Sequence, residues 1–95
     1  MITIEEIKKV ISEIAPKYHL TKVTLFGSRA RGNFREDSDI DLIVEFDTAA
    51  VSLFKLSGLM IDLKEIFGVG VDVIHGPIEA DDMIEIDREI EIYAA

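Results

Sequence analysis

The chain has 95 residues, enough for one compact core, and we expect a single domain over residues 1–95. Its formal net charge of −9 would repel a phosphate backbone, so a free-standing nucleic-acid binder is disfavoured. Cysteine is absent, which excludes disulfides, thiolate catalysis and sulfur-ligated zinc, and any bound metal must therefore be held mainly by oxygen.

The distribution of apolar residues is typical of a soluble folded domain. Hydrophobic residues make up 48% of the chain and charged residues 31%. No apolar run approaches the roughly 20 residues that a membrane-spanning helix needs, and the amino terminus has neither a basic region nor a cleavage-like site. We therefore expect a cytoplasmic protein without membrane contact.

The first segment carries the signals of an amphipathic helix. Thr3 is the expected N-cap, with Glu6 three residues later, and apolar residues then recur on one helical stripe as far as Ile14. Because proline disfavours helical geometry in the residue before it, the helix should end or bend near Pro16.

Two strands and a turn follow this helix. Residues 22–26 are expected to form a short strand, and residues 27–32 a turn or a single helical turn between two glycines. After a loop, residues 39–46 alternate in hydrophobicity, so that Asp39 and Asp41 point to the same face of a second strand.

The second half of the chain predicts another helix, a third strand and a last helix. Ser52 is the expected cap of a helix that continues through about Phe67, with Gly68 stopping it. Residues 70–74 are expected to form the strand, and the segment after Pro77 the final helix. Its apolar residues would be Met83, Ile84, Ile86, Ile90 and Ile92. This order predicts an α+β fold, a small mixed β-sheet with helices on one face.

Paired aspartates are the first candidate for chemistry. Asp39 and Asp41 stand one strand period apart, so their carboxylates converge. Such carboxylates repel each other unless a cation lies between them, and Mg²⁺ typically takes one or two protein carboxylates together with substrate phosphates. Asp72 joins the cluster if its strand lies beside theirs; a plain surface position is the alternative. The three would hold Mg²⁺ or Mn²⁺, and Asp72 could also help to deprotonate an attacking hydroxyl.

A glycine-serine turn is the second candidate. Gly27 and Ser28 follow a strand, where backbone N–H groups and a hydroxyl would face an anion such as a triphosphate tail. Arg29, Arg31 and Arg35 lie in the same stretch, as phosphate neutralisation would require. Surface ion pairs are an equally physical use of these arginines. We assign Gly27, Ser28 and Arg29 to nucleotide binding.

These two motifs together resemble a known family. The segment Phe26-Gly27-Ser28-Arg29-Ala30-Arg31-Gly32 is followed, with ten residues between its serine and the first aspartate, by Ser38-Asp39-Ile40-Asp41-Leu42. This pattern resembles the DNA polymerase β nucleotidyltransferase superfamily. It is most similar to the minimal members, the MntA-type antitoxins paired with HEPN-domain toxins, and the likeness runs from the first helix to at least Ile74.

The resemblance implies a fold, a reaction and a partner. The fold would be the palm-like nucleotidyltransferase fold, and the reaction a Mg²⁺-dependent transfer of AMP from ATP to a hydroxyl. The acceptor would be a tyrosine on a cognate HEPN toxin, which the chain would neutralise as its antitoxin. In such families the glycine-serine turn holds the triphosphate, the paired aspartates bind Mg²⁺, and a third acidic residue, here Asp72, completes the triad.

Two alternatives to this enzymatic hypothesis stay open. One is a non-catalytic antitoxin that neutralises its toxin by direct binding, and the other is a small-molecule nucleotidyltransferase, which would need additional acceptor-binding structure. Because nearly all residues are spent on the donor site, we expect the acceptor to arrive as a partner protein in a hetero-oligomer. A net charge of −9 favours a basic surface on that partner.

Overall fold

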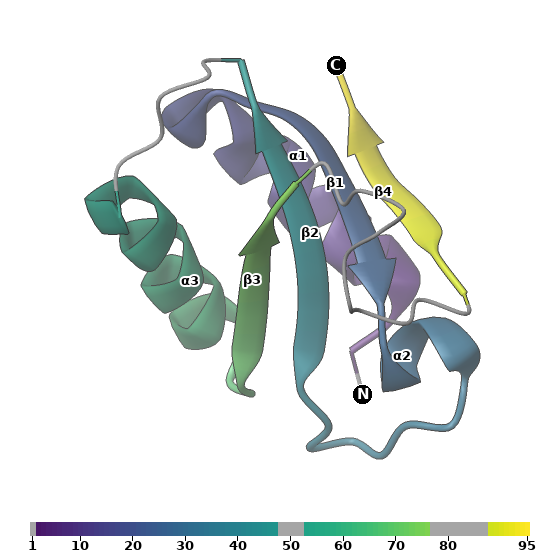
Figure 1. Ribbon diagram of the computed structural model, residues 1–95. Helices are drawn as coiled ribbons and strands as arrows, with labels where there is room; N and C mark the ends of the chain where they lie inside the picture. The colour runs from purple at the N-terminus through teal and green to yellow at the C-terminus, as the bar shows by residue number, and fades with distance from the viewer. Residues whose placement is uncertain (1, 48–52, 77–87) are drawn as a thin grey trace.

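A mixed four-stranded sheet with helices on one face forms the part of the chain that the computed structural model describes, residues 2–47, 53–76 and 88–95. The elements are α1 (Ile4–Tyr18), β1 (Leu20–Phe26), α2 (Ser28–Arg31), β2 (Ile40–Phe46), α3 (Leu53–Phe67), β3 (Val71–His75) and β4 (Ile90–Ala94). The strand order is β3-β2-β1-β4, with β2 parallel to β3 and the other neighbours antiparallel (Figure 1). The predicted α+β fold class is confirmed.

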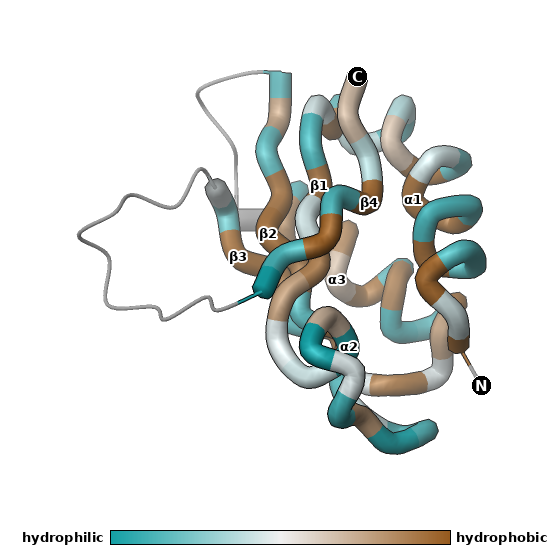
Figure 2. The backbone as a smooth tube through the Cα atoms, turned by 90° about the vertical axis from the view of Figure 1, so that its right-hand side faces the viewer, coloured by the Kyte–Doolittle hydropathy of each residue, from teal (hydrophilic) through white to brown (hydrophobic). Residues whose placement is uncertain are grey.

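One face of the sheet packs against the two long helices. Figures 1 and 2 place α1 and α3 on the same side of the sheet. Alternate strand residues and the inner faces of both helices make the core between them, and fully buried members are Ile7, Ile11, Val23, Leu25, Ile40, Leu42, Val44, Leu59 and Leu63. Burying each such side chain contributes about 1.5–3 kcal/mol. The strand residues between these positions point to the opposite face, where Asp41 lies.

Helix α1 begins as expected but ends later than expected. The Glu6 N–H donates to Thr3 Oγ1 at 3.1 Å, which confirms the cap. The helix then continues through Pro16 and ends at Tyr18, two residues beyond the expected point. A proline in the last turn removes only one helical hydrogen bond, and burial of Tyr18 in the core outweighs that loss.

The carboxy-terminal segment is a strand where a helix was expected. Residues 77–87 lie outside the described residues, but Ile90–Ala94 form β4, antiparallel to β1. The helix prediction is therefore wrong for Ile90 and Ile92. Pairing with β4 satisfies the backbone N–H and C=O groups on the otherwise free edge of β1. Ile92 packs into the core and is only 6% exposed. This long-range pairing overrides the local pattern.

The remaining boundaries agree closely with expectation. Helix α3 ends at Phe67, and Gly68 follows at φ 73° with its N–H donating to the Lys64 carbonyl at 2.9 Å. The expected cap Ser52 lies outside the described residues. In the part of the chain that the structure describes, no helix is long and apolar enough to cross a membrane.

A polar link joins the two long helices near the end of α1. The Tyr18 hydroxyl donates to Asp62 Oδ2 at 2.5 Å, and Lys17 Nζ reaches the same oxygen at 3.0 Å. Tyr18 and Lys17 hold the pKa of the Asp62 carboxyl below its usual value. The link therefore fixes the middle of α3 relative to α1.

We expect Tyr18→Phe to lower the free energy of unfolding by about 1 kcal/mol, because the variant keeps the buried ring and loses one hydrogen bond. Since the pKa of Asp62 is lowered in the fold, its contribution is present above the ordinary aspartate pKa of about 4 and is lost as pH falls through the lowered value. The gap between wild type and variant should therefore shrink in acid. Denaturant titrations at several pH values measure it.

Tyr93→Phe is the matched control, since Tyr93 is a half-buried tyrosine on β4, at the opposite edge of the sheet from β3 and α3. A pH-independent gap for Tyr18→Phe would contradict the role of Asp62.

Candidate active site

Three strand ends meet at one edge of the sheet. Because β1 runs antiparallel to β2 and β3, its last residues lie at the same end of the sheet as the first residues of both, with β2 between β1 and β3 (Figure 1). The register pairs Phe26 with Asp41, and Asp41 with Asp72. The structure therefore brings Asp72 next to Asp41, and Asp39 precedes β2 at the same edge.

The carboxylates are close enough to perturb each other. Asp41 is half-buried, whereas Asp39 and Asp72 are exposed. Burial raises the pKa of the Asp41 carboxyl, and the charge and hydrogen bonding of Asp72 raise it further, with a smaller effect from Asp39. Arg31 acts in the opposite direction. The carboxylates therefore repel each other, and binding of a proton or a cation would relieve this repulsion.

Two glycines make room for these carboxylates. A Cβ on Gly27 would overlap the carboxylate of Asp41, and a Cβ on Gly70 would overlap that of Asp39. Gly27 also has φ 75° and ψ −157°, a conformation that L side chains rarely adopt. The Ile40 N–H donates to the Gly70 carbonyl at 2.9 Å, and this hydrogen bond holds Gly70 close to Asp39. Gly70 was not singled out from the sequence; a glycine at the start of a strand was the available signal.

The predicted glycine-serine turn opens a single helical turn. In α2 the N–H groups of Ala30 and Arg31 donate to the Gly27 carbonyl, both at 3.1 Å. The first two N–H groups of α2 are those of Ser28 and Arg29, and Gly27 has no side chain that could cap them. Such N–H groups at a helix start can donate hydrogen bonds to an anion. Since Gly27 touches Asp41, this turn and the carboxylates form one continuous surface.

Arg29 makes contacts that the sequence did not predict. It is 3% exposed, and its guanidinium donates to the Ser38 carbonyl at 2.8 and 3.1 Å and to the Glu36 carbonyl at 3.2 Å. The Phe34 ring lies 4.9 Å from the guanidinium carbon. Its assignment to nucleotide binding stays a prediction, and these contacts are all with the chain itself.

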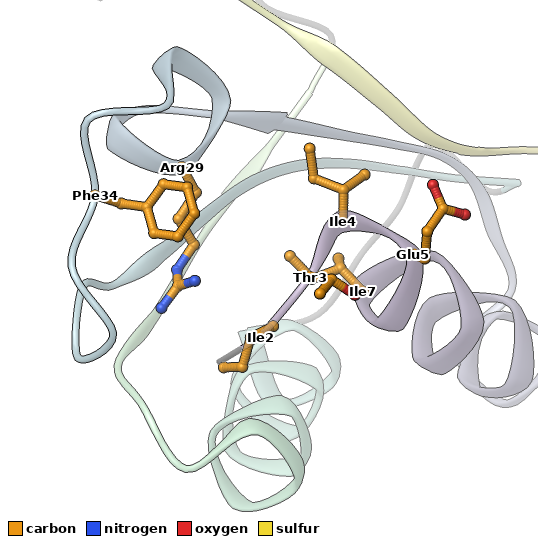
Figure 3. A pocket seen from close by; sticks show the side chains of 7 residues that line it. All are labelled: Ile2, Thr3, Ile4, Glu5, Ile7, Arg29 and Phe34. Carbon is orange, nitrogen blue, oxygen red and sulfur yellow. The ribbon is translucent and has the colours of Figure 1, made fainter.

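A cavity of about 280 Å³ lies beside Arg29 and Phe34, at the start of α1 (Figure 3). Its other walls are Ile2, Thr3, Ile4, Glu5 and Ile7. None of the three aspartates lines it. The chemistry of the site therefore belongs to the open surface at the strand ends and not to this cavity.

The donor set fits a hard divalent cation. Its side-chain ligands would be carboxylate oxygens, which suit Mg²⁺ or Mn²⁺. Within residues 2–47, 53–76 and 88–95, no group of three or more histidine or acidic side chains is gathered to hold a metal ion. One or two carboxylates with substrate phosphates are the usual Mg²⁺ arrangement, so the fit depends on the substrate.

Comparison with known proteins gives the class. The family model of the nucleotidyltransferase domain matches residues 4–93. The chain therefore belongs to the nucleotidyltransferase domain family, and the predicted enzyme class is confirmed.

Two relatives are named as protein adenylyltransferases. The protein adenylyltransferase MntA of Thermococcus cleftensis is 33% identical over 78 residues, which cover 78% of this chain and 78% of the relative. A Methanocaldococcus jannaschii protein, provisionally named a protein adenylyltransferase, is 41% identical over 73 residues, 77% of each chain.

Solved structures share the fold at low sequence identity. A toxin–antitoxin crystal structure with AMP-PNP has a TM-score of 0.76 at 17% identity, covering 93% of this chain and 73% of the other. A Shewanella oneidensis complex of a tri-AMPylated HEPN toxin with its MNT antitoxin has a TM-score of 0.68 at 14% identity, covering 98% and 74%. At these identities the likeness shows the fold.

We expect Asp41→Asn to melt at a higher temperature than the wild type near neutral pH. The pKa of Asp41 is raised in the fold, so its ionised form destabilises the fold at neutral pH. This penalty is absent below the ordinary aspartate pKa of about 4, so the advantage of the variant should vanish as pH falls to that value. Thermal denaturation across pH measures it.

Asp47→Asn, the same exchange at an exposed position just beyond the far end of β2, is the control and should show no such gain. A lower melting temperature for Asp41→Asn at neutral pH would argue against carboxylate repulsion.

Three glycine variants should separate backbone strain from displacement of the carboxylates. Gly32→Ala adds only strain, because Gly32 has φ 86° and no atom within 4 Å of its added Cβ. Gly70→Ala adds only the overlap with Asp39, and Gly27→Ala adds strain and overlap with Asp41. We expect about 1–3 kcal/mol of destabilisation from strain. Calorimetry should show Mn²⁺ binding weakened in the Gly27 and Gly70 variants and retained in the Gly32 variant; equal effects in all three would contradict the close approach.

Proposed function

We propose that this chain transfers AMP from ATP to a tyrosine hydroxyl of a cognate HEPN toxin and thereby acts as its antitoxin. The observation that carries the proposal is the pairing of Asp41 with Asp72 in adjacent strands, beside the Gly27 turn, in a chain of the nucleotidyltransferase family. Carboxylates and an anion-accepting turn on one surface suit a metal-bound nucleoside triphosphate.

The donor half of the reaction follows from the residues at the strand ends. Asp39, Asp41 and Asp72 would hold Mg²⁺ or Mn²⁺ together with oxygens of the triphosphate, and the ion when bound polarises phosphate oxygens and stabilises the leaving pyrophosphate. The N–H groups of Ser28 and Arg29 and the Ser28 hydroxyl would orient the triphosphate. The raised pKa of Asp41 supports this reading, because the carboxylate is one that gains from a neighbouring cation.

The transfer step is a substitution at the α-phosphorus of ATP. The acceptor oxygen forms a bond to that phosphorus, the bond to the oxygen bridging the α- and β-phosphates breaks, and pyrophosphate leaves. The acceptor proton goes to the carboxylate of Asp72, which is exposed and therefore reachable from outside. The carboxylate then returns the proton to water.

The acceptor half rests on the relatives. Proteins named protein adenylyltransferases share a third or more of their aligned residues with this chain. A chain of the solved complex of a tri-AMPylated HEPN toxin with an MNT antitoxin shares its fold. The net charge of −9 favours association with a basic partner. A hetero-oligomer in the cytoplasm is the arrangement that we propose.

We expect Asp39→Asn combined with Asp41→Asn to lower the rate of AMP transfer by about 10²-fold or more, while the fold stays intact. The complex with the HEPN partner is incubated with labelled ATP and Mg²⁺, and mass spectrometry of both chains measures added AMP. Calorimetry should show that ATP binding by the wild type falls when EDTA removes the cation. Asp47→Asn should transfer like the wild type.

Three results would contradict this proposal. Full neutralisation of an unmodified toxin by the double variant would favour an antitoxin that acts by contact alone. AMP found on a small molecule and never on the partner would favour a small-molecule nucleotidyltransferase. ATP binding that is equal with and without EDTA would argue against a metal-bound donor.

A further inference from the structure

Arg29 joins the two motifs of the site. It stands on α2, one residue after Ser28, and its guanidinium donates to the carbonyl of Ser38, the residue that precedes Asp39. The second carbonyl that it reaches, on Glu36, lies in the same loop. One side chain therefore spans from the glycine-serine turn to the start of the aspartate strand.

The loop that Arg29 holds is itself a closed turn. The Ser38 N–H donates to the Arg35 carbonyl at 3.1 Å, and the Arg35 N–H donates to Ser38 Oγ at 2.7 Å. The Phe34 ring packs 4.9 Å from the guanidinium carbon. A planar guanidinium makes several directed hydrogen bonds at once, which a lysine ammonium cannot reproduce in the same geometry. The turn is thus fastened to α2 by charge-assisted bonds and a cation–π contact.

The surroundings of Arg29 do not suit a triphosphate. The guanidinium is buried, and its remaining nitrogen, Nη1, has no hydrogen-bond partner among the described residues. The cavity beside it is lined by four apolar side chains, Ile2, Ile4, Ile7 and Phe34, and by the acidic Glu5 and by Thr3 (Figure 3). A highly charged phosphate chain would lose its hydration in such a place without compensation.

We propose that Arg29 is a positioning residue that sets the distance between the Gly27 turn and the carboxylate of Asp39. The proposal rests on the function proposed above, since it concerns the same site. The ten residues between Ser28 and Asp39 leave that distance free in an unfolded chain, and the Arg29 contacts fix it in the fold. A displacement of about 1 Å between a bound donor and a catalytic group can cost about 10²-fold in rate.

Arg29→Lys is the first test, with Arg88→Lys, the same exchange at an exposed position before β4, as the control. We expect kcat to fall by about 10²-fold and the KM for ATP to stay close to that of the wild type. Mn²⁺ affinity measured by calorimetry should fall, and the amide resonance of Asp39 in NMR spectra should shift. All values are corrected for the folded fraction from circular dichroism.

Phe34→Leu is the second variant, which keeps the three hydrogen bonds and loosens the ring contact, in case Arg29→Lys does not fold. We expect a smaller fall in kcat and in Mn²⁺ affinity, in the same direction. Wild-type kcat and Mn²⁺ affinity in both variants, with only a lower melting temperature, would overturn the proposal. A raised KM for ATP at unchanged kcat would also overturn it, in favour of direct nucleotide contact by Arg29.

The wild type separates this proposal from the proposed function. If the wild type transfers no AMP in the presence of its partner, the proposed function fails, whereas Mn²⁺ affinity and the Asp39 resonance still test the positioning role. If the wild type transfers AMP and the variants match it, only the positioning role fails.

Discussion

The parallel pairing of β2 with β3 is the constraint on which the rest of this structure depends, because it sets Asp41 opposite Asp72. The half-buried carboxylate of Asp41, held beside that of Asp72, destabilises the fold in its ionised form, as the raised pKa of Asp41 indicates. The chain tolerates this arrangement because stability is supplied elsewhere. Helix α3 connects the two strands and packs Leu59 and Leu63 into the core, on the face of the sheet away from the carboxylates.

The antiparallel pairing of β1 with β2 adds the second half of the site. It brings the end of β1, and with it Gly27, against Asp41, and the absence of a side chain at Gly27 lets the two meet. Gly70 gives the same room to Asp39. The carboxylates therefore lie against backbone on two sides and are open to the outside on the remaining ones. A surface of this kind can receive a cation and a phosphate chain together, which a closed carboxylate cage could not do.

Family membership and residue-level geometry answer different questions about this protein. The match over residues 4–93 places the chain among nucleotidyltransferases. The strand ends, the two glycines and the Arg29 contacts indicate how its own residues would carry out such a transfer. The proposal of a protein partner rests on the names of the relatives, on a solved toxin–antitoxin complex that shares the fold, and on the negative charge of the chain. Together they support the proposed transfer to a partner protein.

Local patterns in the sequence determined the features that depend on neighbouring residues. The alternation of residues 39–46 put Asp39 and Asp41 on one face, Thr3 and Glu6 marked the start of α1, and Gly27 and Gly32 bracketed the single helical turn α2. Only the tertiary structure decided the features that depend on distant residues. It placed Asp72 beside Asp41, made a strand of Ile90–Ala94 and turned Arg29 into the loop before Asp39. The physical reason is that side-chain direction and capping follow from a few bonds along the chain, whereas strand pairing and burial are chosen by the free energy of the whole fold.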